Sequence, residues 1–355
     1  MTNAAGGREV KLSCRDVWKV YGADPDSFFN ARSGRVDDPK GLISRVRESG
    51  HIVASADVSF DVHEGEIFII MGLSGSGKST IVRCLSRLVE PTAGEVIFNG
   101  KDLLKSSRDE LTDIRRHKMG MVFQNFGLMP HLTALDNVAF PLKVQGVAPT
   151  ARLKRAAEML ELVGLSGREK NFPSELSGGQ QQRVGIARSL AVEPELWFLD
   201  EPFSALDPLI RRQMQDEFLR LQKMLHKTIV FITHDFLEAL RLGDRIAIMK
   251  DGVVVQIGTP SEVVMRPADD YVAEFTQDVP RVKVITVGEC MQSGPPPAIV
   301  AGEVPLGLTL EGVLPRFARG AAALACVDES GTVRGHVTPN GVLKALATAA
   351  EERAT

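Results

Sequence analysis

A glycine-rich segment, Gly72-Leu73-Ser74-Gly75-Ser76-Gly77-Lys78-Ser79, matches the phosphate-binding pattern GxxxxGK[ST]. A continuous apolar run at 67–71 precedes it and a helical pattern follows, which is the strand–loop–helix context that the pattern requires. Glycines let successive backbone N–H groups converge on phosphate oxygens. We therefore expect Lys78 to neutralise the β- and γ-phosphates of a nucleotide and the Ser79 hydroxyl to bind Mg²⁺. The alternative, a glycine-rich turn without a ligand, is disfavoured by the strand and helix on either side.

Two acidic residues, Asp200 and Glu201, end a second apolar run at 196–200. A carboxylate at the carboxyl end of a buried parallel strand lies where ligands bind in such sheets. Asp200 is predicted to hold the magnesium, directly or through water, and Glu201 to polarise the attacking water as a general base. His234 follows a third such run and is predicted to contact the γ-phosphate. Alone, an acidic pair is more often a helix cap and a single histidine a structural residue, so both assignments depend on Lys78.

A run of small and polar residues, Leu176-Ser177-Gly178-Gly179-Gln180, opens another helical pattern, QQRVGIARSLA. It leaves backbone N–H groups and a serine hydroxyl exposed at a helix start, which suits an anion. By itself it could be a capped helix. Coincidence is not credible when it is combined with the phosphate loop, Gln124, Asp200-Glu201, Ser204-Ala205-Leu206-Asp207 and His234, in chain order.

Buried strands and helices must position these residues. Continuous or β-branched apolar runs predict strands at 67–71, 119–124, 196–200, 228–233 and 245–249, and the alternating segment 10–21 predicts an edge-type strand. A helical pattern at about 208–226 separates two of the runs, so we expect βαβ units and a parallel sheet. Residues 128–190 are predicted to be mainly helical.

Composition limits the function classes. The chain has 355 residues and a net charge of -3, so no electrostatic preference for nucleic acid or anionic lipid is expected. The four cysteines contain no CxxC pair, which indicates neither a metal site nor a disulfide framework. No signal peptide is expected, and no apolar stretch approaches the roughly 18 residues of a spanning helix. Any work at a membrane would therefore be done through a partner.

Taken together, these motifs resemble the full motif set of ABC-type ATPases, over about residues 10–275. The resemblance implies an α/β P-loop NTPase fold of ABC type, a mixed sheet core plus a helical subdomain at about 126–190, within a domain at 1–276. It also implies two copies facing head to tail around ATP and Mg²⁺, with ATP held between the phosphate loop of one copy and Ser177, Gly178, Gly179 and Gln180 of the other.

The resemblance assigns a role to each matching residue. Gln124 would sense the magnesium and link the site to a membrane partner, Asp207 would communicate across the dimer, and Tyr21 would stack on adenine. A core position in its strand is the alternative for Tyr21. The predicted site residues are Glu201, His234, Lys78 and Gln124 for catalysis; Tyr21, Gly72, Ser74, Gly75, Ser76, Gly77, Lys78, Ser79 and Thr80 for ATP; and Ser79, Gln124 and Asp200 for Mg²⁺.

Several segments are similar to the ATPases of glycine betaine, proline betaine and choline importers. They are the long insertion at about 22–54 and the strings MGLSGSGKST, LMPHLTALDNVAFPL, FSALDPLIRRQMQDEF and GDRIAIM. This similarity implies a peripheral protein on the cytoplasmic face of the inner (plasma) membrane. It would act with an integral membrane permease and, indirectly, with a substrate-binding protein, energising uptake of a quaternary-amine compatible solute.

The segment 281–348 is similar to a single CBS module, a small α+β unit, and 349–355 is a short tail. An acidic residue that the family often places three positions after Thr338, to contact a nucleotide ribose, is absent, since Gly341 stands there. A structural or dimerising module is therefore as well supported as a sensor.

Three alternatives remain at this point: an importer ATPase for another small polar solute, a soluble ABC ATPase of DNA repair or translation, and a binding module without catalysis. The second is disfavoured by the single nucleotide domain and the absence of a basic stripe. The third is disfavoured because Lys78, Asp200, Glu201 and His234 are all present.

Overall fold

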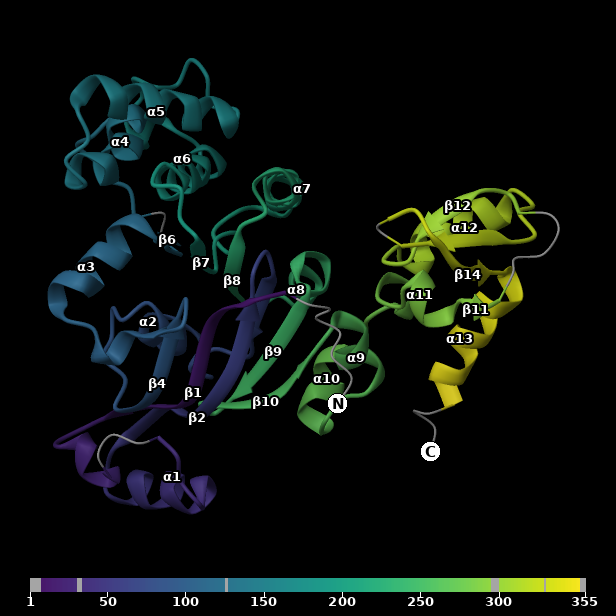
Figure 1. The fold of residues 1–355 in the computed structure, drawn as a ribbon, viewed down its shortest axis with the longest axis horizontal. Helices are drawn as coiled ribbons and strands as arrows, with labels where there is room; N and C mark the ends of the chain where they lie inside the picture. The colour runs from purple at the N-terminus through teal and green to yellow at the C-terminus, as the bar shows by residue number, and fades with distance from the viewer. Residues whose placement is uncertain (1–7, 31–33, 125–126, 295–299, 329, 352–355) are drawn as a thin grey trace. The chain divides into compact units, whose positions relative to one another are not determined.

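The computed structural model describes residues 8–30, 34–124, 127–294, 300–328 and 330–351 (Figure 1). The chain divides into two compact units, Met1–Ile257 and Gly258–Thr355. This division lies earlier than the predicted boundary at residue 276, because two short helices that follow the last strand of the first unit belong to the second unit.

A six-stranded sheet forms the centre of the first unit, in the order β10-β9-β3-β8-β7-β6. Its strands are β3 (Ile67–Met71), β6 (Met119–Val122), β7 (Leu196–Asp200), β8 (Thr228–Thr233), β9 (Arg245–Lys250) and β10 (Val253–Gly258). All residues of β3, β7 and β8 are buried, as their apolar runs predict. β8 lies parallel between β3 and β7, with Met71 beside Thr233 and Asp200 beside Ile232. Since parallel strands end at the same edge, the segments that follow these three strands meet there.

A second, antiparallel sheet has the order β2-β1-β4-β5. It consists of β1 (Val10–Tyr21), β2 (Ile52–His63), β4 (Ala93–Phe98) and β5 (Lys101–Asp102). The prediction of an edge position for β1 is wrong, because β1 pairs with both β2 and β4. Alternation of apolar and polar residues identifies a half-buried strand but does not reveal how many neighbours it has.

The main core of the first unit joins the two sheets. Phe60 of β2 stacks on Phe68 of β3 with ring centroids 4.7 Å apart. The helix α2 (Lys78–Leu85) contributes Ile81, Val82 and Leu85 to the same fully buried cluster. The phosphate-loop segment between β3 and α2 is therefore anchored at both ends in the core.

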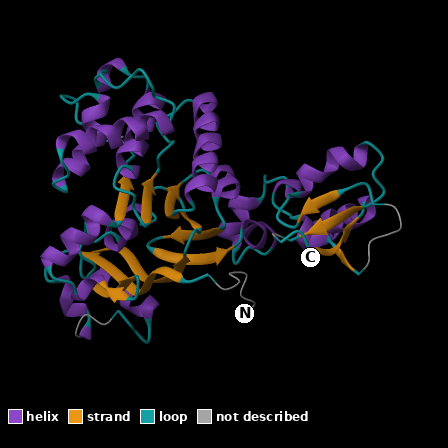
Figure 2. Ribbon diagram, turned by 45° about the horizontal axis from the view of Figure 1, so that its top comes forward, coloured by secondary structure: helices purple, strands orange, loops and turns teal. Residues whose placement is uncertain are grey.

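Three helices that lie together at one end of the first unit form the helical subdomain (Figures 1 and 2). The subdomain contains α4 (Ala134–Val144), α5 (Pro149–Leu162) and α6 (Gly178–Leu190), which pack on one another. The segment 22–54, predicted to be an insertion, carries η1 (Pro25–Phe28) and α1 (Pro39–Glu48), and α1 packs on β2. The remaining helical elements of the unit are η3 (Leu103–Lys105), α3 (Arg108–His117), η4 (Pro173–Glu175), α7 (Pro208–Leu225) and α8 (Phe236–Leu242).

The second unit is a small α+β arrangement. It comprises α9 (Pro260–Met265), α10 (Asp270–Thr276), η5 (Arg281–Lys283), α11 (Val287–Cys290), β11 (Gln292–Ser293), β12 (Glu303–Pro305), α12 (Leu310–Ala318), β13 (Leu324–Val327), β14 (Val333–Val337) and α13 (Pro339–Glu351). β12 and β13 are parallel and joined through α12, and β14 then runs antiparallel to β13. The assignment of this unit as CBS-like stays a prediction. Within the described residues, no helix is long and apolar enough to cross a bilayer.

Candidate active site

A cavity of about 610 Å³ at the carboxyl edge of the six-stranded sheet collects most of the predicted site residues. Its lining consists of Ile52, Val53, Ala54, Leu73, Ser74, Gly75, Gly77, Lys78, Ser79, Thr80, Gln124, Glu201 and His234. Residues that are far apart in the sequence converge here because β3, β7 and β8 end at the same edge. The volume falls within the range of about 300–1,000 Å³ that is typical of small-molecule sites.

The backbone of the phosphate loop can be formed only with glycine at two positions. Gly72 and Gly77 have φ of 150° and 98°, in the region that glycine tolerates and other residues rarely adopt. A Cβ on Gly72 would lie 2.2 Å from the carbonyl oxygen of Met249, and one on Gly77 would lie 2.3 Å from that of Ala54. The loop is thus held tightly between the end of β9 and the start of β2, and α2 begins immediately after Gly77.

Lys78 is held inside this loop. Its Nζ atom donates to the carbonyl oxygens of Gly72 and Leu73, each at 2.9 Å, which uses two of its three N–H donors. Burial lowers the pKa of the ammonium, while the charges of Glu201 and Asp200 act in the opposite direction. The hydroxyl of Ser76 is buried and has no hydrogen-bond partner among the described residues. A buried cation with a donor to spare and an orphaned hydroxyl both fit a phosphate group.

Ser79 and Asp200 provide the oxygen atoms that suit a hard divalent cation. The Ser79 hydroxyl donates to Oδ1 of Asp200 at 3.1 Å. Burial raises the pKa of the Asp200 carboxyl, partly countered by the Ser79 hydrogen bond and by Arg83 and Lys78. Hydroxyl and carboxylate oxygens are the ligands that Mg²⁺ uses together with phosphate oxygens, so this pair fits the predicted metal.

Glu201 is held between its two predicted neighbours. Its Oε2 atom accepts from Nδ1 of His234 at 2.9 Å and from Nε2 of Gln124 at 3.3 Å. Its backbone is left-handed, with φ of 46°, and is fixed by a hydrogen bond from Glu201 N to Ile232 O at 3.0 Å. The carboxylate therefore lines the cavity in a conformation that costs a residue with a Cβ some stability.

Tyr21 is not among the residues that line the cavity. Its ring is 43% exposed and lies under the Lys19 ammonium, 4.7 Å from Nζ to the ring centroid. Its register partner across the sheet, Ile52, does line the cavity and is 67% exposed. Sequence reasoning missed Ile52, since an isoleucine that opens an alternating strand carries no signal that distinguishes it from a core residue.

The segment Ser177–Gln180 and Asp207 also lie outside the cavity lining. Ser177 Oγ accepts from Gln180 N at 3.3 Å, and Gln180 Oε1 accepts from Ser177 N at 2.9 Å, which forms a capping box at the start of α6. Asp207 caps α7 by accepting from the backbone N–H groups of Leu209 and Ile210. Ser177, Gly178 and Asp207 are exposed, so they are available to a second molecule rather than to the cavity of their own chain.

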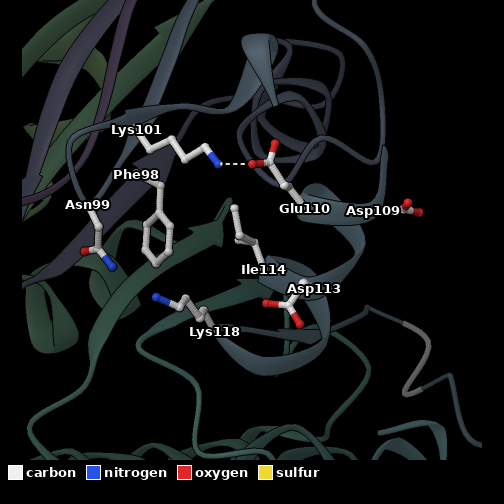
Figure 3. A pocket seen from close by; sticks show the side chains of 8 residues that line it. All are labelled: Phe98, Asn99, Lys101, Asp109, Glu110, Asp113, Ile114 and Lys118. Atoms are coloured by element: carbon white, nitrogen blue, oxygen red, sulfur yellow. Dashed lines mark hydrogen bonds and ion pairs between the residues drawn. The ribbon is translucent and has the colours of Figure 1, made fainter. Parts of the chain in front are cut away.

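Two further depressions in the first unit contain none of the predicted nucleotide-binding residues. One, of about 500 Å³, lies between the β4–β5 turn and α3, and the Lys101–Glu110 ion pair crosses it at 2.8 Å (Figure 3). The other is a groove of about 360 Å³ between α3, β6 and the helical subdomain. Its apolar lining includes Met119, Met121, Phe123, Met129, Phe140 and Val144, and its cationic lining includes Arg115, Arg116 and Arg188.

Comparisons with known proteins define the class. The chain matches the ABC transporter family over residues 55–204. It is 54% identical over 339 residues to the trimethylamine N-oxide transport system ATP-binding protein TmoW of Ruegeria pomeroyi, which covers 94% of this chain and 96% of the relative. It is 49% identical over 332 residues to TmoW of Pelagibacter ubique, with the same coverage. The glycine betaine transport ATP-binding protein OpuAA of Bacillus subtilis is 48% identical over 285 residues, or 80% of this chain and 67% of the relative.

The chain therefore belongs to the ATP-binding subunits of ABC transporters, and it is an ATPase. Its fold agrees with that of the ATP-binding cassette MJ0796, solved as a dimer in a post-hydrolysis state with ADP and Pi, at a TM-score of 0.58 and 37% identity. That match covers 70% of this chain and 98% of the cassette. The predicted family and the predicted ABC-type fold are confirmed.

Proposed function

We propose that this chain hydrolyses ATP to energise uptake of a small, fully methylated amine solute, and that trimethylamine N-oxide is the solute best supported. The observation that carries the choice of solute is the extent of similarity. The TmoW relatives match over 96% of their own length, whereas the glycine betaine relative OpuAA matches over 67%. Glycine betaine, proline betaine and choline form the second candidate group, since OpuAA is still 48% identical.

Within the cavity, the phosphate loop is proposed to bind the phosphates of ATP. The N–H groups at the start of α2 and the remaining Lys78 donor would face the anion. Magnesium would be held by Ser79 and Asp200, with Gln124 as a further oxygen ligand, and it would neutralise charge on the β- and γ-phosphate oxygens. The 3.1 Å contact between Ser79 and Asp200 supports their sharing one ligand.

Glu201 is the proposed general base and His234 its partner. A general base must lie within hydrogen-bond reach of the proton that it removes. Glu201 lines the cavity, and the hydrogen bond from His234 at 2.9 Å fixes the direction of its carboxylate. The proton of the attacking water would pass to the Glu201 carboxylate, and His234 would hold that carboxylate in place.

A second copy of the chain is the proposed partner at the nucleotide. At the start of α6, Ser177 and Gly178 are exposed and do not line the cavity of their own chain, which supports binding to the ATP of the other copy. The MJ0796 cassette described above is dimeric, which supports the same arrangement. Asp207, exposed at the start of α7, is proposed to contact the partner copy.

The groove between α3, β6 and the helical subdomain is the proposed docking site for the permease. It presents an apolar floor with Phe140 36% exposed and is rimmed by arginines, and its lining includes Gly127 and Met129, which come soon after Gln124 in the chain. A peripheral location on the cytoplasmic face of the membrane follows from that contact. A substrate-binding protein would act through the permease only. The second unit stays assigned, as a proposal, to a single CBS-like module at 281–348.

Uptake in cells that lack the gene tests this proposal. The cells are complemented with wild type or with Glu201→Gln and given labelled trimethylamine N-oxide, glycine betaine or choline in turn. We expect wild type, and not the variant, to restore uptake of trimethylamine N-oxide. Restored uptake of only glycine betaine or choline would replace the solute and keep the importer, whereas no uptake of any of the three would overturn the importer assignment for methylated amines.

A further inference from the structure

Arg211, on the first turn of α7, contacts two segments that flank the proposed catalytic pair. Its Nε atom donates to the carbonyl oxygen of Phe203 at 3.2 Å, and Nη2 donates to that of Leu206 at 3.1 Å. Its third nitrogen, Nη1, lies 3.6 Å from Oδ2 of Asp235. Each nitrogen of one guanidinium group therefore has a different target, and the three separate nitrogens of the planar fork reach positions that the single nitrogen of an ammonium could not reach together.

These targets lie directly beside Glu201 and His234 in the chain. Phe203 and Leu206 belong to the turn between Glu201 and Asp207, and Asp235 follows His234. The turn is already tied to Glu201, whose carbonyl oxygen accepts from Ser204 N and from Ser204 Oγ. Arg211 thus bridges the segment after β7 to the segment after β8, behind the 2.9 Å contact between the two side chains.

A second bridge one helical turn further on fixes α7 against α8. Gln215 Nε2 donates to Oε1 of the buried Glu238 at 2.8 Å, and Arg241 Nη1 donates to Gln215 Oε1 at 3.0 Å. The frame of the two helices is therefore held without Arg211. Arg211 adds the contacts that join the turn after Glu201 to the turn after His234.

We propose that Arg211 is a positioning residue for hydrolysis: it joins the turn between Glu201 and Asp207 to the His234-Asp235 turn and thereby sets the placement of the Glu201 carboxylate. The inference rests on the proposed role of Glu201. It concerns chemistry and not nucleotide binding, since Arg211 does not line the nucleotide cavity and directs its hydrogen bonds to the turn that follows Glu201. Misplacement of a catalytic group by about 1 Å costs up to about 10²-fold in rate.

The test measures Mg²⁺-dependent ATPase activity of the full chain, with equilibrium titration of a fluorescent ADP analogue on the same samples. We expect Arg211→Gln to lower kcat by about 10–100-fold and to leave the dissociation constant of the analogue within about twofold of wild type. Arg211→Lys keeps the charge toward Asp235 but loses the fork, so its kcat should fall between the two. Arg212→Gln is the matched control, an exposed arginine one residue on, and should behave as wild type.

Asp235→Asn, alone and combined with Arg211→Gln, tests whether the two turns act through one contact. The asparagine keeps an oxygen for the Glu238 N–H that Asp235 caps. If the Arg211–Asp235 contact accounts for the loss of kcat, the double variant should have the same kcat as Arg211→Gln. Its kcat should not be lowered by both single-variant factors multiplied together. A wild-type kcat in Arg211→Gln, or equal losses of kcat and of analogue binding, would overturn the inference. Failure of the proposed function would show separately, as a Glu201→Gln variant that hydrolyses ATP like wild type.

Discussion

Nδ1 of His234 lies 2.9 Å from Oε2 of Glu201, so the side chains that follow two neighbouring parallel strands meet at the edge of the cavity. The contact occupies one ring nitrogen of the imidazole and leaves the other for a second partner. It also orients the carboxylate from one side while Gln124 contacts the same oxygen from another segment. Two other parts of the chain thus contact this one oxygen atom.

Replacing Glu201 with glutamine should separate binding from turnover. The amide keeps the shape of the side chain but cannot take a proton, so we expect turnover to fall by about 10²–10⁴-fold with nucleotide affinity retained. Steady-state ATPase assays and nucleotide titration measure the two quantities. Glu161→Gln, at an exposed position on α5, is the matched control. Unchanged turnover in the Glu201 variant would remove this residue from the role of general base.

Lys78→Ala should lower nucleotide affinity and ATP hydrolysis together. A hydrogen bond to a charged group contributes roughly 1.5–3 kcal/mol, so we expect nucleotide affinity to fall by about 10–100-fold and hydrolysis to fall with it. The comparison is with Lys223→Ala, an exposed lysine on α7. Full retention of binding and hydrolysis in Lys78→Ala would contradict the assignment of the phosphate loop.

Asp200→Asn should raise the magnesium requirement. The substitution removes a negative charge from the oxygen pair formed with Ser79, 3.1 Å away. We expect the Mg²⁺ concentration for half-maximal turnover to rise by about 10–100-fold. Titration of MgCl₂ at fixed ATP measures it, and chelation with EDTA should abolish turnover in wild type. Asp113→Asn, in the pocket of Figure 3, is the control, and a magnesium curve that is the same in all three proteins would exclude Asp200 as a ligand.

A charge in the proposed permease groove should uncouple transport from hydrolysis. Phe140→Asp places a carboxylate on the apolar floor, so we expect uptake in complemented cells to fall at least about tenfold, while ATPase activity of the purified chain stays near wild type. Leu153→Asp is the control, because Leu153 has a similar exposure, 37% against 36%, on a neighbouring helix and does not line the groove. Wild-type uptake in Phe140→Asp would exclude the groove as the docking site.

Glu195 should make stability depend on pH in the acidic range. Its carboxylate lies 2.7 Å from Lys11 Nζ, accepts from Asn99 Nδ2 at 2.8 Å and lies 3.5 Å from Lys118 Nζ, which links the antiparallel sheet to the parallel sheet. Desolvation raises the pKa, but these partners outweigh it and lower the pKa from 4.5 to about 2. Because the folded pKa is depressed, the stabilisation is fully present above about pH 4.5 and is lost as the pH falls toward 2.

The measurement for Glu195 is the urea midpoint of unfolding of wild type and Glu195→Gln at several pH values. The side chain is 37% exposed, so solvent screening reduces the expected effect of its ion pairs. We expect the free energy of unfolding of wild type to exceed that of Glu195→Gln by about 1 kcal/mol at pH 7. The difference should shrink between pH 4.5 and pH 3. A difference that stays constant with pH would show that the variant acts through packing and not through charge.

Local sequence patterns predicted most of the residues that line the cavity at the carboxyl edge of the six-stranded sheet. The mainly apolar runs of β3, β7 and β8 indicate the bounds of these strands, and the predicted βαβ units place Lys78, Glu201 and His234 at one edge of the sheet, where they line one cavity. What the sequence could not show was pairing across the chain. The neighbours of β1 and the position of Ile52 in the cavity depend on register between distant strands.

Arg211 illustrates the same limit for side chains. In the sequence it is one of two adjacent arginines on a charged helix, and nothing separates it from Arg212. Only in the folded chain do the turns that follow Glu201 and His234 bring two carbonyl oxygens and a carboxylate within its reach. Contacts of this kind involve backbone groups from several segments. Since every residue type has the same backbone carbonyl, the sequence does not indicate which carbonyls will accept these hydrogen bonds.

The left-handed backbone of Glu201 has an evolutionary consequence. At φ of 46°, a residue with a Cβ bears a conformational cost of about 1–2 kcal/mol. Glycine would remove that cost and add about 0.4–1 kcal/mol of chain entropy to the unfolded state. Backbone conformation alone therefore does not favour glutamate over glycine at this position, and the glutamate is favoured by its side-chain contacts and by its proposed contribution to turnover. In a laboratory screen for heat resistance, this position is one where more robust but inactive variants should accumulate.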